Sequence, residues 1–135
     1  MVAERLLELI AQLELGQGIS STSIQDVQSK LGLRLPGDYV NFILSFNGGE
    51  GFVGNSYLVL WPIEEIIPMN EACQVQKFAP GLLLFGSDGG GEAYAFDTRS
   101  DSMSVVKVSF VGMSLAEAEV IARTFTDFLE YLHNH

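Results

Sequence analysis

The stretch Leu31–Gly49, LGLRLPGDYVNFILSFNGG, contains signals for the start, the body and the end of one helix. Pro36 suits the first turn, because the N–H that proline lacks would have no partner there. Asp38 places a negative charge near the positive end of the helix dipole. All but two of the residues Tyr39–Phe46 are apolar, so burial on most sides is expected. The closing NGG is predicted to end the helix, since Asn and Gly accept the left-handed conformation of a C-cap.

Two further helices are predicted before this stretch. The first spans Val2–Leu15 and is stopped by Gly16, with apolar residues at helical spacing: Val2, Leu6, Leu9, Ile10 and Leu13. The sequence GQGISSTS then predicts a loop. A short helix follows, with Ser23 or a neighbour as N-cap and Gly32 closing it. Its inward residues are expected to be Ile24, Val27 and Leu31.

After the stretch the pattern changes to short, β-rich segments bounded by turn residues. The expected strands are Tyr57–Trp61, Leu82–Gly86, Ala93–Phe96 and Ser104–Phe110. Between the first two, Pro62 and Pro68 act as breakers around one or two short helical turns. Short loops separate the last three strands, so consecutive antiparallel pairing is expected.

A final amphipathic helix is predicted over Ser114–Leu132. Ser114 and Glu117 form a capping-box pattern, and the apolar residues that follow recur every three or four positions. A coiled-coil seam is the alternative, but the repeat covers fewer than three heptads. The expected fold class is therefore α+β. A mainly antiparallel sheet of about four to six strands is surrounded by N-terminal helices and this C-terminal helix. Residues 1–135 are expected to form a single domain.

The charge balance is compatible with a basic protein partner. The 135 residues are 47% hydrophobic and 18% charged, with 7 Lys+Arg against 17 Asp+Glu and a net charge of −10. Such a surface repels nucleic acid and anionic membranes and attracts a basic protein. The alternative is that the acidity serves only solubility.

The expected compartment is the cytoplasm. Cys73 is the one cysteine, so no internal disulfide can form and a reducing environment is favoured. The opening MVAERLLELIAQLEL carries acids where a signal peptide needs a basic start and an uninterrupted apolar run. No apolar run approaches the roughly 18 residues that a membrane span requires.

The Gly-rich loop Asp88–Glu92 is the first place to look for chemistry. It lacks the Lys of a phosphate-binding loop, acids flank its three glycines, and a strand is expected after it. The acids around it also lack calcium-loop spacing, and the chain has too few Cys and His for zinc. No cofactor or metal site is therefore predicted.

No catalytic residue is predicted either. The two histidines, His133 and His135, lie in the terminal tail, where no Ser-His or Cys-His pair can be built. Cys73 is interpreted as a small, partly buried residue rather than a nucleophile. Hydrolysis of a sugar by two carboxylates is an alternative that the sequence leaves open, although the spacing of the acids does not single out any particular pair. Trp61 could anchor a partner, but a core position is favoured.

Four segments in order resemble the SUKH superfamily of Smi/Knr-type domains. LGLRLPGDYVNFILSFNGG looks like its signature, and LWPIEEI, FGSDGGGEAYAFD and ARTFTDFLEYL are similar to its later segments. The similarity runs from about Ser23 to Leu132, so the predicted helix Val2–Leu15 lies outside it. The residues at the signature positions are Leu35, Pro36, Tyr39, Phe42, Asn47, Gly48 and Gly49.

The resemblance implies an α+β, non-enzymatic domain with no catalytic residues to carry over. Bacterial members are similar to immunity proteins that neutralise a cognate polymorphic toxin, often a nuclease. Fungal relatives act as regulatory scaffolds in cell-wall synthesis.

We therefore expect an immunity protein that binds a contact-delivered toxin through an acidic surface. A regulatory scaffold is the main alternative, and an unrecognised enzyme is the third. The candidate partner-binding residues are acids in expected loops: Glu50, Glu64, Glu65, Asp88, Glu92 and Asp101. For each of them an ordinary solvated carboxylate is the alternative interpretation.

Overall fold

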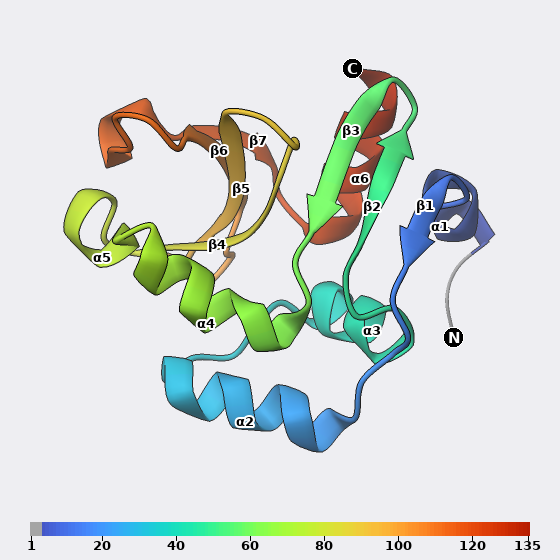
Figure 1. The fold of residues 1–135 in the computed structure, drawn as a ribbon, viewed down its shortest axis with the longest axis horizontal. Helices are drawn as coiled ribbons and strands as arrows, with labels where there is room; N and C mark the ends of the chain where they lie inside the picture. Colours follow the sequence, from blue (N-terminus) through green and yellow to red (C-terminus); the bar gives the residue numbers. More distant parts are fainter. Residues whose placement is uncertain (1–3) are drawn as a thin grey trace.

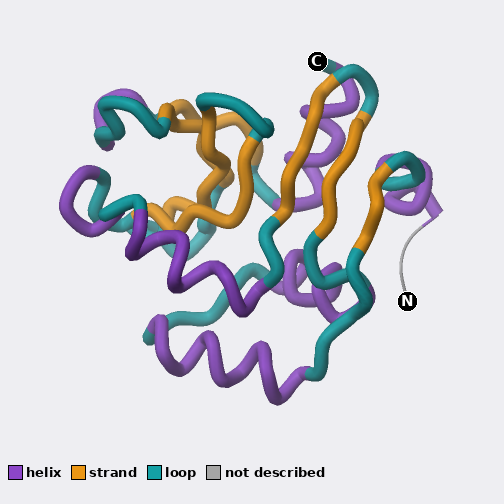
Figure 2. The backbone as a smooth tube through the Cα atoms, in the orientation of Figure 1, coloured by secondary structure: helices purple, strands orange, loops and turns teal. Residues whose placement is uncertain are grey.

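A computed structural model describes residues 4–135 of the chain, with helices packed around one antiparallel sheet (Figures 1 and 2). The helices are α1 (Glu4–Leu9), α2 (Ser21–Leu31), α3 (Gly37–Ser45), α4 (Ile63–Ala72), α5 (Val75–Phe78), the 3₁₀ turn η1 (Leu115–Glu117) and α6 (Phe125–Asn134). The strands are β1 (Leu13–Leu15), β2 (Gly49–Val53), β3 (Ser56–Leu60), β4 (Leu82–Ser87), β5 (Glu92–Asp97), β6 (Val105–Ser109) and β7 (Glu119–Ala122).

The expected α+β class is confirmed, with a sheet of seven strands in sequence order, slightly more than expected. The sheet has two parts, because β3 and β4 share only the pairs Val59–Ser87 and Leu60–Gly86 and then diverge (Figure 1). The β4–β6 part is buried on both faces, which explains its almost continuous apolar strands.

Two hydrophobic cores cover the two faces of the β4–β6 part. The larger core contains Phe85 and Phe96 together with α3 and α6, and it continues under β2 and β3. The smaller core contains Leu84 and Val106 together with α5. On the β1–β3 part the larger core covers one face, and α6 lies against that face (Figure 1). The smaller core reaches the opposite face at Val59 on β3, and the exposed side chains of Glu14, Glu50 and Phe52 lie farther out on that face.

The central helix is close to the one predicted. Pro36 directly precedes α3, and Tyr39, Phe42 and Ile43 are buried in the larger core. The predicted end is partly wrong, because Phe46 caps the helix in an extended conformation with φ −142°. The left-handed glycine, Gly48 with φ +88°, comes two residues later, where it turns the chain into β2.

The predicted helix Val2–Leu15 is wrong beyond Leu9, and Val2 lies outside the described residues. The chain turns after α1 and forms β1, which pairs with β2 in the register Leu13–Gly51 and Leu15–Gly49. A Cβ at Gly49 would lie 2.6 Å from a β1 carbonyl oxygen, so glycine permits this close pairing. Long-range pairing overrides the local helical period.

Gly16 is likewise not a helix cap. A Cβ built on it would lie 2.7 Å from the Asn47 carbonyl oxygen, so it allows the chain to pass close to the end of α3. The predicted loop before α2 is present, and Ser20 is the N-cap, its side chain accepting the Ser23 N–H at 3.2 Å. Gly32 closes α2 with φ +72°, as predicted.

The final helix is also shorter than predicted. The Ser114 side chain caps only the turn η1, and β7 then pairs with β6 through Val106–Val120. The helix begins after Thr124, whose side chain accepts the Asp127 N–H at 3.0 Å. Sheet pairing of β-branched residues takes the place of the first helical turns. Pro68 is not a breaker either, because it lies inside α4.

Candidate partner-binding surface

Three acidic side chains from separate elements gather at one hollow, which we call the acidic hollow: Glu14 on β1, Glu50 on β2 and Glu65 in the first turn of α4. The hollow has a volume of about 360 Å³, and the rest of its lining consists of Gly49, Val59, Leu60, Trp61 and Pro62. All three carboxylates are exposed, whereas Trp61 is 8% exposed, as its predicted core position requires.

Strand register creates this arrangement. Glu14 and Glu50 are directly opposed residues on the outer face of β1 and β2. Like charges in that position repel each other and destabilise a sheet. The ion pairs among residues 4–135 join Arg5 to Glu8 and Glu130, Lys30 to Asp26, and Arg99 to Asp97, so none of them neutralises the hollow. The hollow therefore keeps its negative charge available to a partner.

Glu50 also has a neighbour that holds it in place. The Tyr57 hydroxyl on β3 donates a hydrogen bond to the Glu50 carboxylate. That hydrogen bond raises the pKa of Tyr57, and partial burial and the nearby charges of Glu50 and Glu14 raise it further. The Tyr57 hydroxyl therefore remains a donor at neutral pH, and the Glu50 carboxylate has a fixed position.

Glu64 precedes Glu65 on α4, but it lines the neighbouring groove between α2 and α4 rather than the hollow, and it has a structural contact. Its carboxylate accepts a hydrogen bond of 2.8 Å from the Asn47 side-chain amide, whose oxygen accepts the Ile63 N–H at 2.8 Å. Asn47 thus fixes the start of α4, and with it the position of Glu65. Sequence reasoning assigned Asn47 only to a turn. The residue pair Asn47 and Ile63 is 16 positions apart, and no local signal links them.

The remaining predicted acids do not join this group. The Asp88 carboxylate accepts the N–H groups of Gly90 at 2.8 Å and Glu92 at 3.2 Å, so it shapes the β4–β5 turn. Glu92 is half-buried at the start of β5. Asp101 is exposed in the β5–β6 loop. Of the predicted acids, the structure thus brings together Glu50 and Glu65, and it adds Glu14, which sequence reasoning placed in a helix.

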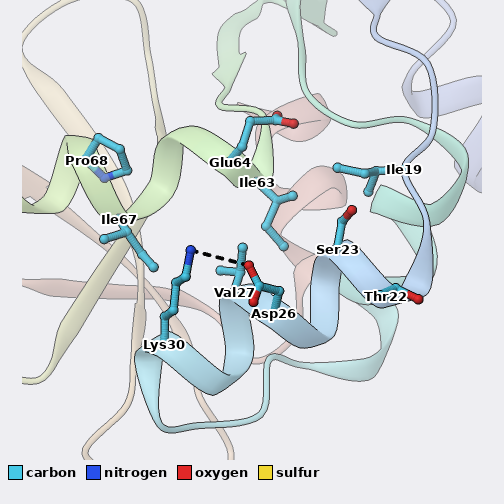
Figure 3. A pocket seen from close by; sticks show the side chains of 10 residues that line it. All are labelled: Ile19, Thr22, Ser23, Asp26, Val27, Lys30, Ile63, Glu64, Ile67 and Pro68. Carbon is cyan, nitrogen blue, oxygen red and sulfur yellow. Dashed lines mark ion pairs between the residues drawn. The ribbon is translucent and has the colours of Figure 1, made fainter.

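A second, larger concavity of about 570 Å³ lies between α2 and α4 (Figure 3). Its lining combines apolar side chains such as Val27, Ile63 and Pro68 with polar ones. Lys30 pairs at 3.3 Å with Asp26, one turn earlier on the same helix α2 (Figure 3). The hydroxyls of Thr22 and Ser23 line it too, but no histidine does, so the groove holds no Ser-His pair.

Other groups with chemical potential have ordinary structural surroundings. Burial raises the pKa of the half-buried Cys73 thiol, which keeps it protonated and weakly nucleophilic. Within residues 4–135, no three His, Cys, Asp or Glu side chains are placed to hold one metal ion. None of the helices in this part of the chain is both long enough and apolar enough to cross a bilayer.

Comparison with known proteins gives two findings. The model of the SMI1/KNR4 family (SUKH-1) matches residues 18–131, which is most of the chain. A Bacillus subtilis (strain 168) protein named Uncharacterized protein YnaB is 42% identical over 80 residues, which are 59% of this chain and 51% of that protein. The chain thus spans about half the length of the curated relative it matches.

Proposed function

Because the chain belongs to the SMI1/KNR4 family (SUKH-1), we propose that it is a non-enzymatic protein-binding module that neutralises a cognate toxin. The toxin is a contact-delivered polymorphic toxin with a basic surface, such as a nuclease active site. The proposal treats residues 1–135 as one domain, which the long family match and the single seven-stranded sheet support. It also expects the two proteins to meet in the cytoplasm, where such a toxin acts.

The observation that carries the proposal is the acidic hollow. Glu14, Glu50 and Glu65 meet there without an ion-pair partner among the described residues. A nuclease must hold phosphates with Lys and Arg, so an acidic protein surface can occupy the same site. Complementary charge also speeds the encounter, which matters when a toxin must be captured before it acts. Glu64, which precedes Glu65 on α4, is proposed to add to the negative field around the hollow.

Co-expression tests the proposal. The product of the open reading frame beside this gene is expressed in a bacterial host from an inducible promoter, with or without the full chain. Survival and complex formation are then scored. We expect the wild-type chain to restore growth and to co-purify with the toxin. The triple variant Glu14→Lys, Glu50→Lys and Glu65→Lys should lose both properties.

The control carries the same charge change elsewhere. Glu4, Asp101 and Glu117 are exposed and lie outside the hollow, so their triple Lys variant should still protect. Loss of protection by both triple variants would show that net charge alone matters. If the wild-type chain gives no protection and co-purifies with host proteins instead, the proposal fails in favour of a regulatory scaffold.

A further inference from the structure

An aromatic pair lies on the same sheet face as the acidic hollow. Phe52 on β2 and Tyr57 on β3 are directly opposed, and their rings meet edge to face at 5.1 Å between centroids. Phe52 is 49% exposed, whereas Val53, the next residue on the strand, is fully buried on the other face. A single exposed apolar side chain is common on protein surfaces, but Phe52 differs because it pairs with a second aromatic ring beside carboxylates that have no ion-pair partner among the described residues.

The pair is held in a fixed conformation before any partner arrives. The Tyr57 hydroxyl is tied to Glu50, and Phe52 contacts one edge of the ring. The β4–β5 turn packs against the Tyr57 ring, since a Cβ at Gly89 would lie 2.8 Å from its Cδ2 atom. Gly89 has φ +80°, so the turn needs glycine for its backbone as well as for this approach. A rigid aromatic surface loses little conformational entropy on binding, which is typical of interface anchors.

The charges around the pair indicate what covers it. Glu50 lies between the aromatic pair and Glu14, and no basic side chain forms an ion pair with either acid in residues 4–135. A second copy of the chain would bring further carboxylates against these, which repulsion disfavours. A partner with basic side chains around an apolar recess fits both the ring and the charges.

We infer that Phe52 and Tyr57 form the apolar anchor of the partner-binding surface, and that the partner presents an apolar recess bordered by Lys and Arg side chains. This inference rests on the proposed function, because it describes the protein that the acidic hollow binds. The hollow supplies electrostatic attraction, and the aromatic pair supplies the contact that excludes water. The Gly-rich β4–β5 turn then has a defined role, which is to pack against the Tyr57 ring and hold it in position.

Defined peptides test the chemistry without the natural partner. The full chain, labelled with ¹⁵N, is titrated with the capped hexapeptides KRWLRK, KRSSRK and EDWLED, and backbone amide shifts are followed by NMR. We expect KRWLRK to shift the amides of β2 and β3 and to bind at least about tenfold more tightly than either other peptide. Binding of KRWLRK at another surface, or equal binding of KRSSRK, overturns the inference.

Matched variants locate the contact. Phe52→Ser should weaken KRWLRK binding about tenfold, and Phe52→Leu should restore most of it. Phe78 on α5 is 47% exposed, so Phe78→Ser is a control of equal exposure and should bind as the wild type does. Unchanged binding by Phe52→Ser contradicts the anchor. Sedimentation of the free chain adds a further outcome, because a dimer that Phe52→Ser dissociates would mean that a second copy covers the face.

The two proposals fail separately. If the chain neutralises the toxin and Phe52→Ser still protects and still binds KRWLRK, only the anchor is wrong. If KRWLRK binds through Phe52 but the neighbouring gene product is not neutralised, only the proposed function is wrong.

Discussion

Replacing Tyr39 with Phe should stabilise the protein. Tyr39 is 2% exposed, and its hydroxyl has no hydrogen-bond partner within the described residues. Its ring packs against Phe96 at 5.0 Å and Phe125 at 5.1 Å between centroids, contacts that Phe would keep. Burial raises the pKa of Tyr39 well above its usual range, so the hydroxyl is a neutral, unsatisfied group at any ordinary pH.

The expected magnitude follows from two terms. A buried unsatisfied polar group costs about 1–3 kcal/mol, which the substitution removes. The void left by one oxygen, on the order of 10 Å³, costs about 0.2 kcal/mol at about 24 cal/mol per Å³. The net gain in the free energy of unfolding is therefore about 1 kcal/mol or more. With an unfolding entropy of about 2.1 cal/mol/K per residue over the 135 residues, each kcal/mol raises Tm by about 3–4 °C.

Urea unfolding at pH 7, followed by tryptophan fluorescence, and calorimetry measure this gain. Tyr57→Phe is the matched control, because its hydroxyl bonds to Glu50 near the surface, and its stability should change by no more than about 0.5 kcal/mol. A loss of about 1 kcal/mol in Tyr39→Phe would refute the reasoning. It would mean that the hydroxyl has a buried partner, such as an ordered water.

Three further changes test other parts of the fold. Gly49→Ala should lower the free energy of unfolding by at least about 2 kcal/mol, because the new Cβ would lie 2.6 Å from the Glu14 carbonyl oxygen and the backbone at this position has φ +154°. Wild-type stability of this variant in urea would contradict the prediction. Asn47→Ala should lower the free energy of unfolding by about 2 kcal/mol, because two hydrogen bonds of the Asn47 side chain are lost. A smaller shift in the urea midpoint than in a surface Asn→Ala control would argue against the role of Asn47 at the start of α4. The Arg99 side chain donates a hydrogen bond to the Asp97 carboxylate and lowers the pKa of Asp97 in the folded state. The Asp97–Arg99 interaction therefore stabilises the fold above the usual carboxyl pKa, and this stabilisation is lost as pH falls through the pKa of Asp97 in the folded protein. The stability difference between wild type and Asp97→Asn should therefore shrink from pH 7 to pH 3, and a constant difference in urea midpoint would contradict the assignment.

Much of the central fold was predictable because its signals are local. Gly32 as a helix cap, the burial of Tyr39 and the four apolar strands all follow from neighbouring residues. The strand β2 was not predicted, because two of its five residues are glycines, which are depleted in strands. The strands β1 and β7 were not predictable from local signals either. Each has three or four residues that continue a helical apolar period, and only pairing with a distant strand, as between Leu13 and Gly51, makes them strands.

The same distinction explains the candidate surface. Glu50 and Glu65 could be selected from sequence as exposed acids, but nothing local indicates that they share a hollow. Glu14 was assigned to a helix, and it reaches the hollow only because β1 pairs with β2. Individual charges are thus readable from the chain, whereas their convergence depends on strand register.

The narrow junction between β3 and β4 has a consequence for how the molecule opens. Two ladder pairs, Val59–Ser87 and Leu60–Gly86, and one hydrogen bond of 3.1 Å from the Trp61 N–H to the Phe85 carbonyl oxygen join the β1–β3 part to β4. Local opening of that part breaks few ladder hydrogen bonds, so its amides should exchange with solvent before those of β4–β6. The part that we expect to open first also carries Glu14 and Glu50 of the acidic hollow. Any ligand held there would slow exchange across β1–β3 first, and binding would be recorded as a rise in local stability.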